Sequence, residues 1–312
     1  MSVRTILHDI YDLTRLPLGV MGAIAGLTAG MFVVLIQEKG SNTDTILLIL
    51  ELLPQYWQLA LLGLCIPFLI IGASMAINDY HDYESDRINE RMDRPLVRNP
   101  NLNPEHVLFL SLVMIASGIL LSFFLFMDNL LVSVGVAIFS FLAISYNIWT
   151  KERGLLGNMT VAACDTAPYL LALIAMGASD IKTILLIIIM AGITFFGVIG
   201  RELVKGIMDI EGDRITKSTT FAVIYGPKRA VQLASVFFFI VILLAPLPLF
   251  IKFHNNILYI FFMVLTIFLL LLSVFVLYSN PSVINGKKAR TYTRTALWTG
   301  AFAFLSGVLF LP

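Results

Sequence analysis

The sequence predicts an all-α integral membrane protein with nine transmembrane helices in a single bundle. Of its 312 residues, 58% are hydrophobic and only 13% are charged, and the mean hydropathy is +0.89. A soluble domain is nearer half apolar and a quarter charged. The apolar residues fall into nine runs, each close to the ~20 residues that a helix needs to cross a bilayer. Basic residues collect between alternate runs, as expected when every second connection lies on the same side of a membrane.

Polar connections separate the nine apolar runs along the chain. Their approximate ranges are 16–37, 55–78, 106–126, 129–149, 155–177, 181–200, 229–251, 256–278 and 293–311. The fifth run contains Asp165 and Pro168, so a kink or a break is expected there. An ionisable side chain inside an apolar run is expected to be functional or to be paired with a partner.

The distribution of Lys and Arg predicts the orientation. If the N-terminus is cytoplasmic, 18 of the 21 basic residues lie in inner connections or at inner helix ends, and the outer side keeps only Lys39, Lys182 and Lys252. Positive charge is enriched on the cytoplasmic side of membrane proteins. The sequence therefore predicts a multi-pass protein of the cell membrane with a cytoplasmic N-terminus and an external C-terminus. The basic run 285–294 is expected to anchor the protein at the inner surface and to contact anionic lipid.

The overall charge balance excludes one class of partner. The net charge is +1 and no basic tail or arm is present, so no nucleic acid is expected to bind. Cys65 and Cys164 both lie in apolar runs, where small buried hydrophobic side chains are expected rather than a disulfide.

A weak internal repeat joins two acidic segments. Asp82 and Asp209 are 127 positions apart, and so are Asp86 and Asp213. The offset equals four helices, so both segments face the same side of the membrane. This pattern indicates a parallel repeat, helices two to five and six to nine, within a single domain over residues 1–312.

The first acidic segment, "NDYHDYESDR", directly follows the second apolar run. At about 100° per residue, Asn78, Asp79, Asp82 and Asp86 share an arc of about 100° if the helix continues through them. Glu84 falls on the opposite side. The segment therefore presents one acidic face at the inner end of a transmembrane helix.

The second segment, "RELVKGIMDIEGDR", follows the sixth run and shows the same arrangement. Asp209, Asp213, Glu202 and Lys205 fall within about 80° of one another, and Glu211 points away. Acids gathered on one face repel one another, so a cation is needed to compensate.

The residue types indicate which cation that is. Carboxylate and amide oxygens without a His or Cys set suit Mg²⁺ rather than zinc, and Mg²⁺ commonly shares its carboxylate ligands with substrate phosphates. A diphosphate held through Mg²⁺ leaves a negative balance that Arg87, Arg94, Lys151 and Lys205 can offset, because Lys and Arg are the usual partners of phosphate.

Together these residues resemble the intramembrane prenyltransferases of the UbiA superfamily. The family motif N-D-x-x-D-x-x-x-D is matched without gaps by Asn78, Asp79, Asp82 and Asp86, and is followed by the family-like "DRPLVR" of 93–98. The second motif, D-x-x-x-D, is matched by Asp209 and Asp213. The helix count and the positions of both motifs also agree, so the resemblance covers essentially the whole chain.

Within the superfamily, the second segment is most similar to archaeal digeranylgeranylglyceryl phosphate synthases. These enzymes transfer a geranylgeranyl group to the free hydroxyl of geranylgeranylglyceryl phosphate in archaeal ether-lipid synthesis. The stretch 145–158, "SYNIWTKERGLLGN", has the same character. One departure concerns Gly206, where that group usually has an Asp directly after Lys205.

The resemblance implies Mg²⁺-dependent ionisation of a prenyl diphosphate, followed by attack of an acceptor on the allylic cation. It implies the following roles. The metal ligands and catalytic residues are Asp79, Asp82, Asp86, Asp209 and Asp213. The substrate-binding residues are Asn78, Arg94, Tyr146, Lys151, Lys205 and Arg15. The implied partners are a prenyl diphosphate, a lipid or aromatic acceptor and the bilayer, with the active site on the cytoplasmic side.

Three alternatives stay open at this point. An aromatic acceptor, such as a quinone precursor, is the runner-up within the family. A transporter also fits a repeat with intramembrane acids, although these acids lie at helix ends rather than at the midplane. A phosphatidyltransferase of the CDP-alcohol kind ranks third, because its D-G-x-x-A-R signature is absent.

Overall fold

The computed structural model describes residues 3–38, 45–52, 54–88, 90–151, 153–215 and 218–311. Every regular element in these ranges is a helix. In chain order the helices are α1 (Val3–Thr14), α2 (Leu16–Glu38), α3 (Thr45–Leu52), α4 (Trp57–Ile88), α5 (Pro95–Arg98), α6 (Pro104–Leu125), α7 (Leu130–Ser145), the π-helical turn η1 (Tyr146–Thr150), α8 (Leu155–Ala175), α9 (Ile181–Ile215), α10 (Phe221–Tyr225), α11 (Pro227–Leu244), α12 (Leu247–Ile251), α13 (Ile257–Ser279) and α14 (Val283–Leu309).

Eight helical segments of the described chain are long and apolar enough to cross a membrane. They correspond to the first eight predicted runs and confirm a multi-pass, all-helical protein. The segments are Leu16–Glu38, Leu61–Glu84, Pro104–Leu125, Leu130–Thr150, Leu155–Ala175, Ile181–Ile215, Pro227–Ile251 and Ile257–Ser279. The fifth run is not broken, since α8 continues through Pro168.

The ninth predicted run lies in α14, which is 27 residues long but is not among these eight segments. Its buried face consists largely of small residues, including Gly286, Ala289, Ala296, Gly300 and Ala303. Small residues let helix backbones approach closely inside a membrane bundle. α14 packs against α13, α9 and α2. Its hydropathy is low because its first turns also carry Lys287, Lys288, Arg290 and Arg294.

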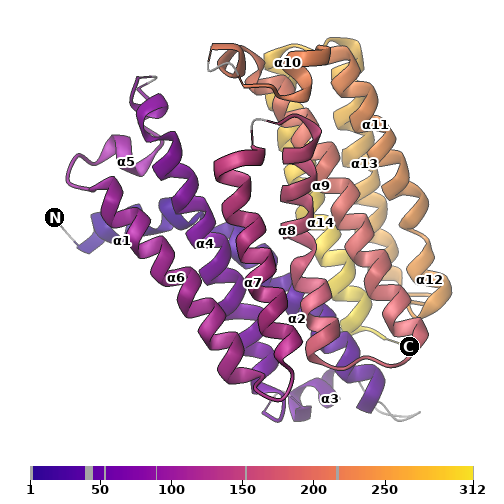
Figure 1. The fold of residues 1–312 in the computed structure, drawn as a ribbon. Helices are drawn as coiled ribbons and strands as arrows, with labels where there is room; N and C mark the ends of the chain where they lie inside the picture. The colour runs from indigo at the N-terminus through magenta and orange to yellow at the C-terminus, as the bar shows by residue number, and fades with distance from the viewer. Residues whose placement is uncertain are drawn as a thin grey trace.

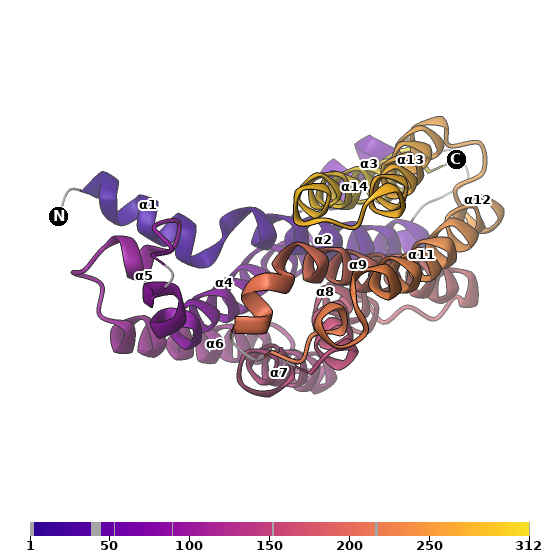
Figure 2. The same cartoon turned by 90° about the horizontal axis from the view of Figure 1, so that it is seen from above.

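The long helices run alternately up and down, so α4 and α9 both end at the upper end of Figure 1. The short helices that follow them, α5 and α10, lie at that same end. Seen from above, α13 and α14 lie on one side of α2 and α9, and α7 lies on the other (Figure 2). This arrangement brings both acidic segments to one end of the bundle.

Helix α1 is tied to the connection that follows the first acidic segment. Asp9, which is 3% exposed, accepts hydrogen bonds from Arg98 Nη2 at 2.7 Å and from Asn99 Nδ2 at 2.7 Å. Arg98 Nη1 also pairs with Asp12 Oδ2 at 2.8 Å. Burial by itself would raise the pKa of Asp9, but the bonds from Arg98 and Asn99 outweigh it, so the pKa lies below its ordinary value.

We expect Asp9→Asn to loosen this connection. A hydrogen bond to a charged group contributes about 1.5–3 kcal/mol, so hydrogen exchange over residues 90–99 should show a local opening free energy lower by roughly this amount. Because the folded-state pKa is lowered, the Asp9 contribution is complete above the ordinary carboxyl pKa of about 4 and is lost as pH falls through the folded value. Exchange equal to wild type at neutral pH would contradict the role of Asp9.

Candidate active site

The first acidic segment forms the last turns of α4, as the helical spacing predicted. Asp79 is 2% exposed and its Oδ1 accepts hydrogen bonds from Arg15 Nη2 at 2.8 Å and from Arg94 Nη1 at 3.0 Å. Arg15 lies between α1 and α2, with a φ of +45°. The junction of α1 and α2, the end of α4 and the connection before α5 thus meet on one buried carboxylate.

Asp82 and Asn78 connect α4 to the turn after α7. Lys151 Nζ donates a hydrogen bond to Asp82 Oδ2, and Asn78 Nδ2 donates to Asn147 Oδ1 at 3.1 Å. Asn147 Nδ2 in turn donates to the Ser74 carbonyl at 3.0 Å. Asn147 lies in the π-helical turn η1, an irregularity that is frequent at functional sites. Asn147 was not among the predicted site residues, although it lies in the stretch 145–158 that resembles the archaeal enzymes and next to Tyr146.

Asp86 lies one turn further along α4 and faces the connection before α5. Its carboxylate is 3.5 Å from Arg94 Nε and 3.9 Å from Arg91 Nη1. Burial raises the pKa of Asp86 above its ordinary value, and Arg94 offsets part of this effect. Arg87, expected to help neutralise these acids, instead pairs with exposed Glu84 at 3.0 Å on the other side of the helix.

The second acidic segment forms the last turns of α9. Thr220 Oγ1, just before α10, donates to Asp213 Oδ2 at 2.9 Å, and Asp209 is half-buried. Lys205 Nζ is 3.6 Å from Glu202 Oε2, one turn earlier on the same helix. A Cβ added at Gly206 would lie 3.7 Å from Ala222 Cβ, an ordinary contact distance. This glycine therefore faces α10.

Electrostatic interactions join the two segments. Arg91 follows the first segment, and its pKa is raised above the ordinary value. The hydrogen bond to Asp93 is the largest cause, and an electrostatic interaction with Asp209 of the second segment contributes as well. Lys151, the partner of Asp82, also interacts with Asp213. Tyr146 interacts electrostatically with Lys205 of the second segment and with Asp82 of the first. The two acidic segments therefore face one shared region.

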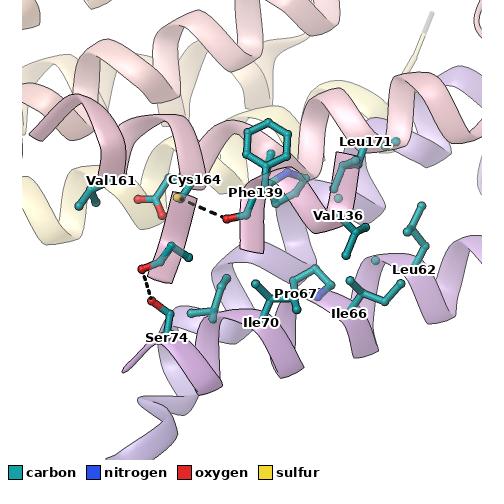
Figure 3. Close-up of a pocket in the computed structure, with 18 of the residues that line it drawn as sticks. Leu62, Ile66, Pro67, Ile70, Ser74, Val136, Phe139, Val161, Cys164 and Leu171 are labelled. Atoms are coloured by element: carbon teal, nitrogen blue, oxygen red, sulfur yellow. Dashed lines mark hydrogen bonds between the residues drawn. The ribbon is translucent and has the colours of Figure 1, made fainter. Parts of the chain in front are cut away.

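An apolar cavity of ≈ 120 Å³ lies between α4, α7 and α8. On α4 it extends from Leu62 to Met75, a rise of about 20 Å at ~1.5 Å per residue. Tyr146 also lines the cavity, so this residue faces the interior, whereas Trp149 is exposed. Figure 3 shows Leu62, Ile66, Pro67, Ile70 and Ser74 from α4, Val136 and Phe139 from α7, and Val161, Cys164 and Leu171 from α8.

Asp165 also lines this cavity, on α8. It interacts electrostatically with Arg201 of α9, whose Nη1 donates to Glu202 Oε1 at 2.7 Å. Arg201 forms its ion pair with Glu202, so a functional or paired role for this intramembrane acid stays a prediction.

The donor set suits a hard divalent cation. Asp79 Oδ2 and Asp86 Oδ2 are buried, and neither accepts a hydrogen bond from any residue that the structure describes. Buried carboxylate oxygens normally accept hydrogen bonds, so these two can accept a ligand. Arg94 Nε, 3.5 Å from Asp86 Oδ2, lies beside the second of them. Across the described ranges, no three His, Cys, Asp or Glu side chains lie close enough together to form a metal site by themselves. The carboxylates are paired instead with Arg15, Arg94 and Lys151.

Comparison with known proteins gives consistent matches. Residues 45–300 match the UbiA prenyltransferase family. The chain is 30% identical to the digeranylgeranylglyceryl phosphate synthase of Archaeoglobus fulgidus, over 80% of this chain and 77% of that protein. It is 31% identical to the enzyme of the same name from Pyrococcus furiosus, over 83% of this chain and 88% of that one.

Solved structures share the fold. A structure described as digeranylgeranylglyceryl phosphate synthase in membranes superposes with a TM-score of 0.70 at 21% identity, covering 97% of this chain and 98% of that one. A UbiA homologue from Archaeoglobus fulgidus bound to DMAPP and Mg²⁺ superposes with a TM-score of 0.61 at 16% identity, covering 96% and 99%.

Proposed function

The chain belongs to the UbiA prenyltransferase family, and we propose that it transfers a geranylgeranyl group from its diphosphate to the free hydroxyl of geranylgeranylglyceryl phosphate. One observation carries the proposal: two acidic helix ends face one region beside an apolar cavity. The names of the relatives at about 30% identity support this acceptor. Family membership favours an enzyme over the carrier and phosphatidyltransferase alternatives.

Mg²⁺ is the cofactor of this proposal. Mg²⁺ is present in a solved UbiA homologue together with DMAPP, and the buried oxygens of Asp79 and Asp86 that accept no hydrogen bond from the described residues fit such an ion. Its proposed ligands, direct or through water, are Asp79, Asp82, Asp86, Asp209 and Asp213. When bound, the ion supplies positive charge that stabilises the departing diphosphate.

Basic side chains around the acids complete the diphosphate site. Arg15, Arg94 and Lys151 each pair with a carboxylate of the first segment, and Lys205 lies one turn before Asp209. We propose that these four donate hydrogen bonds to the diphosphate oxygens as negative charge develops there. Asn78, held by Asn147, accepts a hydrogen bond at 3.4 Å from Arg15 Nη2, the same nitrogen that donates to Asp79, and is proposed to orient Arg15.

The apolar cavity has two tasks. Its walls hold the prenyl chain, and they exclude the water that would otherwise capture the allylic cation. The carbon–oxygen bond to diphosphate breaks, the acceptor hydroxyl attacks the cation, and the hydroxyl proton leaves as the ether forms. Tyr146, between the cavity and the two acidic segments, is proposed to lie beside the reacting carbon.

Orientation belongs to the same proposal. We propose nine membrane crossings, with α14 as the last. The segregation of basic residues then places the N-terminus and the active site on the cytoplasmic side. The acidic repeat is proposed to lie within one domain over residues 1–312. The orientation is tested in sealed vesicles by labelling single cysteines introduced beside Asp86 and beside Lys252. The two positions should be labelled from opposite sides of the membrane.

The acceptor is tested by product analysis. Purified protein is incubated with geranylgeranyl diphosphate, Mg²⁺ and either geranylgeranylglyceryl phosphate or a hydroxybenzoate, and products are identified by mass. Formation of the diether phosphate supports the proposal. Prenylation of the aromatic acid alone would replace it with the aromatic alternative.

The cavity leads to a prediction about donor length. Leu62, at the far end of the cavity on α4, is 5% exposed. Leu62→Trp should lower kcat/KM for the 20-carbon donor about 10-fold or more, because overpacking costs about 1–3 kcal/mol. A 10-carbon donor, which ends short of Leu62, should be used as in wild type. Leu64→Trp is the matched control, because Leu64 is exposed on the same helix and lies outside the cavity. Equal losses with both donors would refute the placement of the chain.

A further inference from the structure

A second, polar hollow lies between α9 and the first turns of α14. It has a volume of ≈ 260 Å³ and is lined by Met208, Lys287, Arg290, Thr291 and Arg294. No carboxylate lines it within the described part of the chain. Figure 1 places the beginning of α14 at the same end of the bundle as α10. The hollow therefore opens at the end that carries the acidic segments.

Helical spacing gathers its three cations on one face of α14. At about 100° per residue, Lys287, Arg290, Thr291 and Arg294 share an arc of about 100°. Like charges three or four residues apart on a helix destabilise it. Among the described residues none of the three cations forms an ion pair, and Arg290 Nη1 donates to the Met208 sulfur at 3.8 Å. This exposed face therefore carries positive charge without a paired carboxylate.

Close packing holds the hollow beside the proposed active site. A Cβ added at Gly286 would lie 3.1 Å from Met208 Cα, so the backbones of α14 and α9 are in near contact there. Met208 directly precedes Asp209 of the second acidic segment. Arg290 also interacts electrostatically with Glu202, the partner of Lys205. The cations of α14 therefore lie next to the part of α9 that carries the second acidic segment.

We propose that this hollow binds the phosphate monoester of the lipid acceptor, an inference that rests on the proposed function. A phosphate monoester carries a charge of about −1.5 to −2 and three strong acceptor oxygens. Arg290 and Arg294 offer planar, bidentate donors, Lys287 adds a third charge, and Thr291 adds a hydroxyl. Arg94 and Lys151 are already paired with Asp79 and Asp82 of the diphosphate site, and Lys205 is paired with Glu202. Separate basic groups for the two substrates would keep the acceptor phosphate apart from the diphosphate.

Steady-state kinetics test the role in acceptor binding. Arg290→Gln and Arg294→Gln should each raise KM for geranylgeranylglyceryl phosphate about 10-fold or more, since a hydrogen bond to a charged group contributes about 1.5–3 kcal/mol. KM for the prenyl diphosphate and kcat should change less than about twofold. Lys288→Gln is the matched control, because Lys288 is an exposed cation next to Lys287 that does not line the hollow. Equal effects from Lys288→Gln would reduce the hollow to a general surface anchor and overturn the proposal.

A binding measurement separates this inference from the proposed reaction. Native mass spectrometry of the full chain should show preferential retention of phosphatidic acid, a phosphate monoester, over phosphatidylglycerol, a diester. Arg290→Gln/Arg294→Gln should lose that preference, and Lys288→Gln should keep it. Competition by inorganic phosphate distinguishes headgroup recognition from recognition of the lipid tail. If the enzyme prenylates only an aromatic acceptor, the proposed function fails, and this measurement still decides whether the hollow binds a phosphate monoester. Equal retention of both lipids by wild type would overturn the inference.

Discussion

Asp82→Asn is expected to lower kcat for prenyl transfer by about 10²–10³-fold or more, the scale for removing one preorganised electrostatic group. The substitution keeps the shape of the side chain but removes its charge. Lys151, which pairs with Asp82, then loses its carboxylate partner. Both metal binding and the position of Lys151 should suffer, and release of diphosphate from geranylgeranyl diphosphate in the presence of acceptor measures the loss.

Glu84→Gln provides the matched control for Asp82. Glu84 is two residues away on the same helix, is exposed, and pairs with Arg87 rather than with the acidic face. This variant should retain transfer within about twofold, because exposed ion pairs contribute little. Near-normal turnover by Asp82→Asn would refute the assignment of the first acidic segment to the metal.

Asp209→Asn, in the second acidic segment, is expected to lower kcat for prenyl transfer by a similar factor. Asp209 is half-buried near the end of α9 and interacts with Arg91 from the connection after α4. Glu211→Gln, an exposed neighbour on the opposite face, should leave transfer unchanged. The rate is measured in the same diphosphate-release assay, with unfolding of each variant in detergent as the check on folding.

The double variant Asp82→Asn/Asp209→Asn tests whether the two segments act together. Residues that act as a unit show grossly non-additive losses. If both segments hold the same diphosphate, the double variant should be little slower than either single variant. Losses that multiply would place the two acids at independent sites and contradict the shared region described above.

Local periodicity explains why much of this site could be predicted. Asp79, Asp82 and Asp86 share one side of α4 because a helix places residues three and four apart on the same face. Glu84 and Glu211 are exposed on the other faces for the same reason. These relations hold within one helix and need no knowledge of its neighbours.

Partners from other helices could not be predicted in this way. Arg15 and Asp79 are 64 positions apart, and Asn78 and Asn147 are 69 positions apart. Arg87 was expected beside the acids but pairs with Glu84, because its position on the helix turns it outward. Which cation reaches which carboxylate depends on how α2, α4 and η1 are placed side by side.

The sequence by itself determined the helical membrane fold and the two acidic faces. Backbone polar groups must be satisfied internally within a bilayer, so long apolar runs become helices whatever surrounds them. The tertiary structure decided that both faces share one region, that α14 packs on small residues against α13, α9 and α2, and that its cations open onto a hollow beside Asp209. These features depend on the relative placement of helices distant in sequence, which periodicity along a single helix does not encode.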